Sequence, residues 1–83
     1  MTLRQQIEKL SNQKMILNST TNRMMEHTIG ISGYLNIIGD DQIVLSSLGG
    51  STMNTSKIIE FNLEHDTLSV VTQSGNTYKF KIV

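Results

Sequence analysis

The C-terminal part of the sequence alternates apolar and polar residues with a period of two, and this pattern limits what the chain can fold into. Aromatic or aliphatic side chains alternate with Thr and Lys over residues 77–82, and a similar alternation runs through residues 58–63. Polar turn signals follow at 64–66 and 74–76. Successive side chains of a strand point to opposite faces, so a strand with one buried face alternates in this way. The pattern predicts antiparallel strands joined by short turns.

A second region of the same period begins at residue 28. Apolar residues or Gly occupy every second position from Ile29 to Ile37, and residues 39–41 form a turn signal. Residues 42–48 are predicted as the returning strand, with Ile43 and Leu45 facing the core and Val44 as a further candidate for it. A glycine inside a strand indicates a bulge or a bend, which we expect at Gly33.

The N-terminus is predicted to be helical. Thr2 and Gln5 have the spacing of a capping box, in which each side chain satisfies a backbone donor at the helix start. Leu3, Ile7 and Leu10 follow at i, i+4 and i+7, which is one helical face. Residues 15–17 are interpreted as a short strand and residues 18–23 as a loop. Residues 48–56 are interpreted as a Gly- and hydroxyl-rich loop between two hairpin regions.

The predicted fold class is therefore α+β and mainly β, in a single domain over residues 1–83. A helical region at 1–17 precedes an antiparallel meander of five to six strands at 28–83. At this size the strands are expected to form a small barrel or a strongly curved sheet.

Composition excludes several classes of protein. The chain has no Cys, and its seven Lys and Arg balance its seven Asp and Glu. The sequence therefore favours neither a disulfide scaffold, nor a thiolate zinc site, nor a basic nucleic-acid-binding domain. It contains no apolar run of the ~18 residues that a membrane span needs, and no signal-peptide core. The expected compartment is the cytoplasm, which is that of a bacterial host cell if a phage encodes the chain.

The small size of the chain favours self-association. With 83 residues and only 5% aromatics, the apolar core is small, and such domains are often completed by another copy. We expect a homo-oligomer with an interface on Leu3, Ile7 and Leu10, and the alternative is an ordinary monomer.

No catalytic constellation is recognisable, so we expect a protein that is not an enzyme, without metal or cofactor. The carboxylates cluster at 40–41 and 64–66, where solvated turns explain them. A weak metal or proton site at Glu64, His65 and Asp66 is the alternative. No Ser lies in a nucleophile elbow.

The best candidate for a ligand-binding site is the loop at 49–56. Glycines let backbone N–H groups approach an anion, and hydroxyl groups add donors. Tyr34 could supply an aromatic surface, and Lys57 and Lys79 could supply positive charge. The alternatives are a plain linker and, for Lys79 and Lys81, protection of a sheet edge. The predicted ligand-binding residues are Tyr34, Gly49, Gly50, Ser51, Thr52, Asn54, Thr55, Ser56, Lys57 and Lys79.

Residues 31–45, ISGYLNIIGDDQIVL, resemble the centre of an Sm-like or Hfq-like barrel. Gly33 and Asp40 or Asp41 match the bent second strand and the Asp-containing turn of that family. The resemblance implies an N-terminal helix before a small barrel, and RNA binding. The hairpin from Leu68 to Val83 departs from the family pattern, and its basic and aromatic RNA-contacting signatures are not recognisable.

The pattern Thr55-Ser56-x-Ile58, Leu68-x-Val70-Val71-Thr72 and Asn76-Thr77-Tyr78 is similar to those of small bacteriophage accessory proteins. Some of these are oligomeric sponges that sequester nucleotide signals of bacterial immunity. The resemblance implies a pocket between subunits that holds phosphates and bases.

The sequence thus yields a ranked set of functions. The first is a non-enzymatic homo-oligomer that sequesters a nucleotide-type anion at subunit interfaces. The alternatives are an inhibitor that binds a host protein through its helix or a sheet edge, and an Sm-like RNA-binding module. Net charge zero disfavours the last of these.

Overall fold

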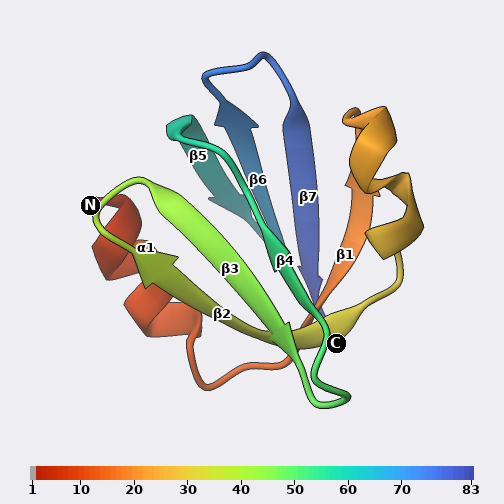
Figure 1. Cartoon of the computed structure of the whole chain (residues 1–83). Helices are drawn as coiled ribbons and strands as arrows, with labels where there is room; N and C mark the ends of the chain where they lie inside the picture. The colour runs from red at the N-terminus through yellow and green to blue at the C-terminus, as the bar shows by residue number, and fades with distance from the viewer. Residues whose placement is uncertain (1) are drawn as a thin grey trace.

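The chain forms seven antiparallel strands in the computed structural model, which describes residues 2–83 (Figure 1). All of them belong to one sheet, in the order β4-β3-β2-β1-β7-β6-β5. The strands are β1 (Met15–Thr20), β2 (Ser32–Ile38), β3 (Gln42–Ser47), β4 (Thr52–Asn54), β5 (Ile58–Glu64), β6 (Thr67–Thr72) and β7 (Thr77–Ile82). The helices are the α-helix α1 (Leu3–Leu10) and the 3₁₀ helix η1 (Arg23–Thr28).

The sheet consists of two three-stranded meanders, and the central strand β1 lies between them. β2, β3 and β4 form the first, β5, β6 and β7 form the second, and β1 pairs with both β2 and β7. Only residues 55–57 join β4 to β5, although these strands are the opposite edges of the sheet. The sheet therefore curls until its two edges meet at one corner (Figure 1).

This architecture confirms the predicted fold class. Across residues 2–83 the two edge strands do not pair with each other, so the sheet is curved and is not a closed barrel. The sheet has seven strands where five to six were predicted, for two reasons. The segment interpreted as a loop at 48–56 contains β4, and β1 begins at Met15, inside the region 1–17 that was predicted to be helical.

The concave side of the sheet holds one hydrophobic core. Leu35, Leu45 and Phe80 are fully buried there, and Tyr78 is 2% exposed. α1 covers part of this core, and its capping box is confirmed because the Gln5 N–H donates to Thr2 Oγ1 at 3.2 Å. The complete buried apolar set is Leu3, Ile7, Leu10, Met15, Leu17, Leu35, Ile43, Leu45, Met53, Ile58, Leu68, Val70, Tyr78 and Phe80.

The predicted loop at 18–23 is wrong over its first half. Residues 18–20 belong to β1, where Ser19 and Thr20 pair with Lys79 and Tyr78 of β7. Residues 18–20 are polar and bury no apolar side chain, so the sequence gives no strand signal there. They form a strand because their backbone pairs with β7. Met25 of the following η1 packs against the core, whereas Met24 is 83% exposed.

Gly33 lies where the two meanders join. It pairs with Met15 of β1 on one side and with Ser47 of β3 on the other. A Cβ atom built on Gly33 would lie 1.9 Å from the backbone oxygen of Ser46, far inside van der Waals contact. Only glycine fits this close approach of two backbones. The pairing of β2 with β3 runs through Gly33 without a register shift, so the glycine marks a close approach of two backbones and no bulge interrupts the pairing there.

We expect Gly33→Ala to lower the free energy of unfolding by at least about 3 kcal/mol, the upper part of the range for overpacked sites. The added methyl group meets backbone, which cannot rotate away. Urea unfolding measures the change. Gly49→Ala is the matched control, because the nearest atom to its Cβ is the Ser47 hydroxyl oxygen at 3.5 Å. Equal stability of both variants would contradict this account of Gly33.

Candidate functional site

The outward side of the first meander carries a set of side chains that strand register brings into rows. Tyr34 of β2 lies opposite Ser46 of β3, which lies opposite Thr52 of β4. The next row consists of Asn36, Val44 and Asn54. We call this surface the Tyr34 face and define it as Tyr34, Asn36, Ile38, Gln42, Val44, Ser46, Thr52 and Asn54.

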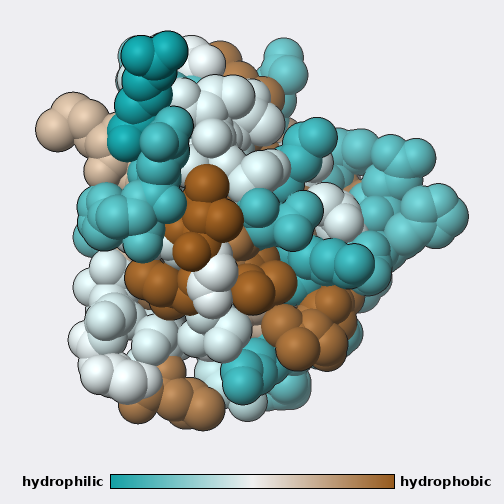
Figure 2. All heavy atoms as spheres, turned by 90° about the vertical axis from the view of Figure 1, so that its right-hand side faces the viewer, coloured by the Kyte–Doolittle hydropathy of each residue, from teal (hydrophilic) through white to brown (hydrophobic). Residues whose placement is uncertain are grey.

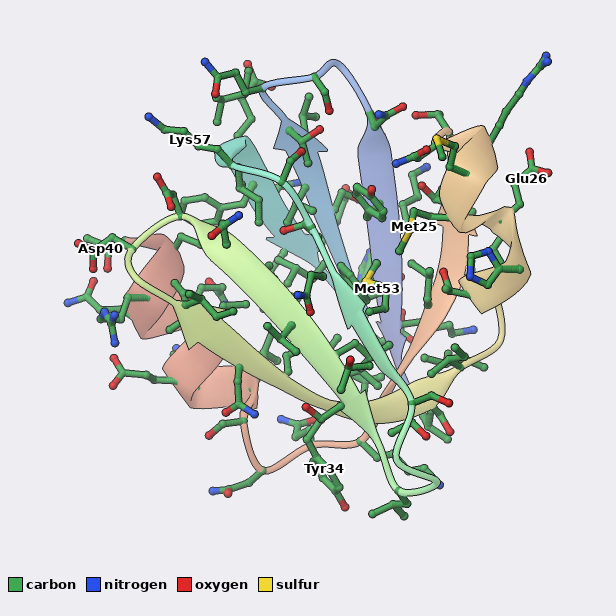
Figure 3. All side chains as sticks on the ribbon, in the orientation of Figure 1. Met25, Glu26, Tyr34, Asp40, Met53 and Lys57 are labelled. Atoms are coloured by element: carbon green, nitrogen blue, oxygen red, sulfur yellow. The ribbon has the colours of Figure 1, made fainter. Side chains whose placement is uncertain are left out.

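The orientation of the Tyr34 face follows from the core. Leu35, Leu45 and Met53 form the intervening row and are 0–1% exposed. Residues opposite each other in a sheet project to the same side, and successive residues of a strand alternate. The neighbours of these apolar residues must therefore point to solvent. Figure 3 shows Tyr34 projecting away from the sheet.

Charge distinguishes this face from the outward side of the second meander. The residues that define the Tyr34 face include no Asp, Glu, His, Lys or Arg. Two of the largest of them are well exposed, Tyr34 at 37% and Ile38 at 49%. The corresponding outward rows of β5, β6 and β7 contain acidic and basic residues. These rows are Glu60–Val71–Thr77, Asn62–Ser69–Lys79 and Glu64–Thr67–Lys81. The zero net charge of the chain thus conceals an uneven distribution.

The tight turn between β3 and β4 borders the Tyr34 face. The Gly49 N–H donates to Ser47 Oγ at 3.0 Å, and the Gly50 N–H donates to the Ser47 carbonyl at 3.2 Å. Gly50 has φ of 90°, a conformation that favours glycine. Both glycine amides are therefore engaged within the turn, which removes the donors expected to hold an anion.

The structure divides the predicted ligand-binding residues among several places. Tyr34, Thr52 and Asn54 share the Tyr34 face, and Gly49, Gly50 and Ser51 form the adjoining turn. The remaining residues of the predicted set, Thr55, Ser56, Lys57 and Lys79, lie elsewhere.

Thr55 is 3% exposed and serves the fold. Its hydroxyl oxygen accepts a hydrogen bond from the buried Ile43 N–H at 3.0 Å, and its own N–H donates to the Ile43 carbonyl. Ser56 is exposed, and its Oγ lies 3.2 Å from Ser74 Oγ in the turn between β6 and β7. Neither hydroxyl belongs to the Tyr34 face.

The two predicted cations also lie apart from that face. Lys57 Nζ is 4.0 Å from Asp41 Oδ2, and Figure 3 shows Lys57 and Tyr34 at opposite ends of the molecule. Lys79 lies on the second meander, where it lines an open hollow of about 270 Å³. The other residues around this hollow are Glu64, His65, Asp66, Thr67 and Ser69. Each cation thus has acidic neighbours, and the two do not converge on the glycine turn.

The sequence 64–66 forms the end of the hairpin between β5 and β6. His65 has φ of 56°, which fits its place in this tight turn. Within the part of the chain that the structure describes, no three His, Asp or Glu side chains are grouped as metal ligands. The solvated turn is sufficient to explain these residues.

Leu3, Ile7 and Leu10, the predicted oligomer interface, are buried in the core of their own chain at 6%, 1% and 3% exposure. α1 packs beside β2, and Arg4 Nε donates to Asp40 Oδ1 at 3.1 Å at the end of the hairpin between β2 and β3. These three apolar side chains are therefore occupied within the chain. A contact between copies would have to use other residues.

A separate surface, made of apolar side chains, lies on the side of the molecule that carries η1. Figure 2 shows apolar residues gathered near the centre of this side, between hydrophilic regions. Met24 of η1 and Ile29, which follows its last residue, are both exposed apolar residues. Asn22, at the start of η1, donates through Nδ2 to the Tyr78 hydroxyl at 3.0 Å and fixes the helix to β7.

Sequence reasoning missed Asn36 and Ser46 as members of a surface. Its assignment of Val44 as a candidate core residue is wrong, because Val44 lies in the outward row between Asn36 and Asn54. The alternation of these residues with Leu35, Ile43 and Leu45 was the available signal, because it already places them on the outward side.

No family model, curated protein or solved structure matches the chain. No helix within residues 2–83 is long and apolar enough to cross a membrane.

We expect Thr55→Val to lower the free energy of unfolding by about 1–3 kcal/mol, because it leaves the buried Ile43 N–H without its acceptor. Urea unfolding followed by circular dichroism measures the loss. Thr52→Val, at an exposed position of the neighbouring strand, should change stability by no more than about 0.5 kcal/mol. A Thr55 variant as stable as the Thr52 variant would show that the hydroxyl is dispensable.

Proposed function

We propose that this chain is a small non-enzymatic binding protein that docks a partner protein on the Tyr34 face. The observation that carries the proposal is an uncharged, exposed surface in a chain whose other outward rows are charged. Protein interfaces are depleted of charged residues at their centre and enriched in Tyr. The partner surface that fits is also uncharged, with apolar groups and hydrogen-bonding groups side by side.

The chemistry of the face supports this kind of partner. Tyr34 offers a large contact area with few rotatable bonds, as the tyrosines of antibody combining sites do. Asn36 and Asn54 provide both donors and acceptors, and Ser46 and Thr52 provide hydroxyl groups. The backbone of these residues is held in paired strands above a closely packed core, so little backbone freedom remains to be lost on binding.

The nucleotide-type ligand stays a prediction that the geometry favours less. An anionic ligand on the Tyr34 face would meet no positive charge among the residues that define this face. The cations Lys57 and Lys79 lie elsewhere, and the glycine amides of the turn are already hydrogen-bonded. The alternative that the protein binds a host protein through the apolar face of its helix is also less favoured, because that face is buried.

The first test uses the immobilised protein to capture partners from an extract of the cells in which it acts. A captured protein is then purified and its affinity is measured by calorimetry. We expect Tyr34→Ala to weaken binding by about 30-fold or more, the loss typical of a tyrosine at the centre of an interface. Lys79→Ala is the control, because its side chain lies on the second meander, and it should leave the affinity unchanged. A Tyr34 variant that binds as tightly as the unaltered protein would refute the proposal.

The second test asks whether nucleotides bind instead. Thermal unfolding is recorded with a panel of mononucleotides and cyclic dinucleotides at millimolar concentration. A ligand at 100 times its dissociation constant stabilises the fold by roughly 2.7 kcal/mol, which is several degrees in a domain of this size. We expect every shift to stay below about one degree. A shift of several degrees with one nucleotide class would overturn the proposed function in favour of nucleotide binding.

A further inference from the structure

β4 ends the sheet and leaves one row of backbone groups without a neighbouring strand. The Ser47 N–H donates to the Ser51 carbonyl, and the Thr55 N–H donates to the Ile43 carbonyl. In an antiparallel pair the residues that bond across the ladder alternate with residues whose N–H and C=O point away. The peptide groups of Thr52 and Asn54 therefore point to the outer side of β4. Within residues 2–83, no strand pairs with them there.

The two edges of the sheet differ in how they are protected. Natural edge strands are blocked by charged side chains, bulges or proline. β5 carries Glu60 and Glu64, and its pairing with β6 is interrupted by a register shift between Ile58 and Glu60. β4 has none of these features, and its residues are Thr, Met and Asn. Of the protective devices named here and the short length of some natural edge strands, β4 shows only the short length, three residues.

The lack of charge on β4 fits one particular occupant. In a two-fold symmetric contact every group near the axis faces its own copy, so a charge on the edge would meet a like charge. β5 would suffer this repulsion between its glutamates. β4 and the Tyr34 face beside it would not, because they contain no Asp, Glu, His, Lys or Arg.

We propose that β4 pairs antiparallel with β4 of a second copy of this chain. The two-fold axis passes beside Met53, so that Thr52 of one copy bonds with Asn54 of the other and the reverse. The row Tyr34–Ser46–Thr52 then continues into the Asn54–Val44–Asn36 row of the second copy. The two Tyr34 faces become one surface on a continuous sheet. This pairing does not depend on the proposed function and adds to it.

The pairing is expected to be weak. The strand is short, so the contact falls below the ~1,200 Å² of a standard specific interface. We expect a dissociation constant on the order of 100 µM. Sedimentation velocity between 10 µM and 1 mM should therefore show the mass rise from monomer to dimer. Monomer at every concentration would overturn the proposal, and so would a larger ring in which β4 pairs with β5 of a neighbour.

Two substitutions at one position test the edge. Asn54→Pro removes a backbone N–H that points away from β3, and it should abolish the dimer. Asn54→Ala removes the side chain and keeps this N–H, and it should leave the dimer intact. Circular dichroism and thermal unfolding establish that both variants fold. A dimer that survives Asn54→Pro in a folded protein would contradict pairing through β4.

Cysteine cross-linking tests whether two copies pair through β4, even if the Asn54→Pro variant fails to fold. The chain has no Cys, so introduced thiols form the only disulfides. Chains with Thr52→Cys are mixed with chains with Asn54→Cys and oxidised, and the antiparallel register predicts a disulfide-linked heterodimer. Chains with Asn62→Cys on β5 are the control and should not cross-link with Thr52→Cys. Equal cross-linking to both positions would overturn the proposed register.

Docking of a partner on the Tyr34 face and pairing through β4 can each be refuted without the other. Tyr34→Ala should weaken binding of a partner protein by about 30-fold or more, while the mass still rises to that of a dimer. Loss of the dimer in the Tyr34 variant would overturn the pairing proposed here, because Tyr34 lies two strands away from the β4 edge.

Discussion

The close approach of two backbones at Gly33 is the constraint on which the rest of the structure depends. β2 pairs with β1 only at Ser32 and Gly33, and at the same point it pairs with β3. A side chain there would push β3 away, and the two meanders would lose their common core. Tyr34, the next residue, points to solvent because it alternates with the buried Leu35. The glycine thus holds together the strands on which the candidate site lies.

Much of the fold could be predicted because local patterns agree with the final structure. The capping box of α1, the alternation in β7 and the turn at 74–76 each need only neighbouring residues to be recognised. β4 could not be predicted in this way, since Met53 is the only apolar residue among polar ones. Its strand conformation depends on Leu45, which lies opposite Met53 and is buried with it. Tertiary pairing decided the structure where the local signal was weak.

The candidate site was harder to predict than the fold for a related reason. Alternation indicates which residues point outward, but it does not tell which strands lie side by side. Tyr34 and Thr52 share a row only because β3 lies between their strands. Lys57 follows β4 closely in sequence, yet it projects at the other end of the molecule beside Asp41. Proximity in sequence therefore misled the assignment of the cations, and register revealed the uncharged face.

The central position of β1 has a consequence for how the protein is made. β1 is the first strand to leave the ribosome, but one of its two neighbours is β7, which is synthesised after all the others. The meander of β2, β3 and β4 can form while translation continues, because its contacts are local. One edge of β1 stays unpaired, and the core beneath it stays incomplete, until β7 has been synthesised and pairs with β1. During that interval the nascent chain exposes an unfinished sheet, and protection from aggregation then depends on the speed of translation and on chaperones.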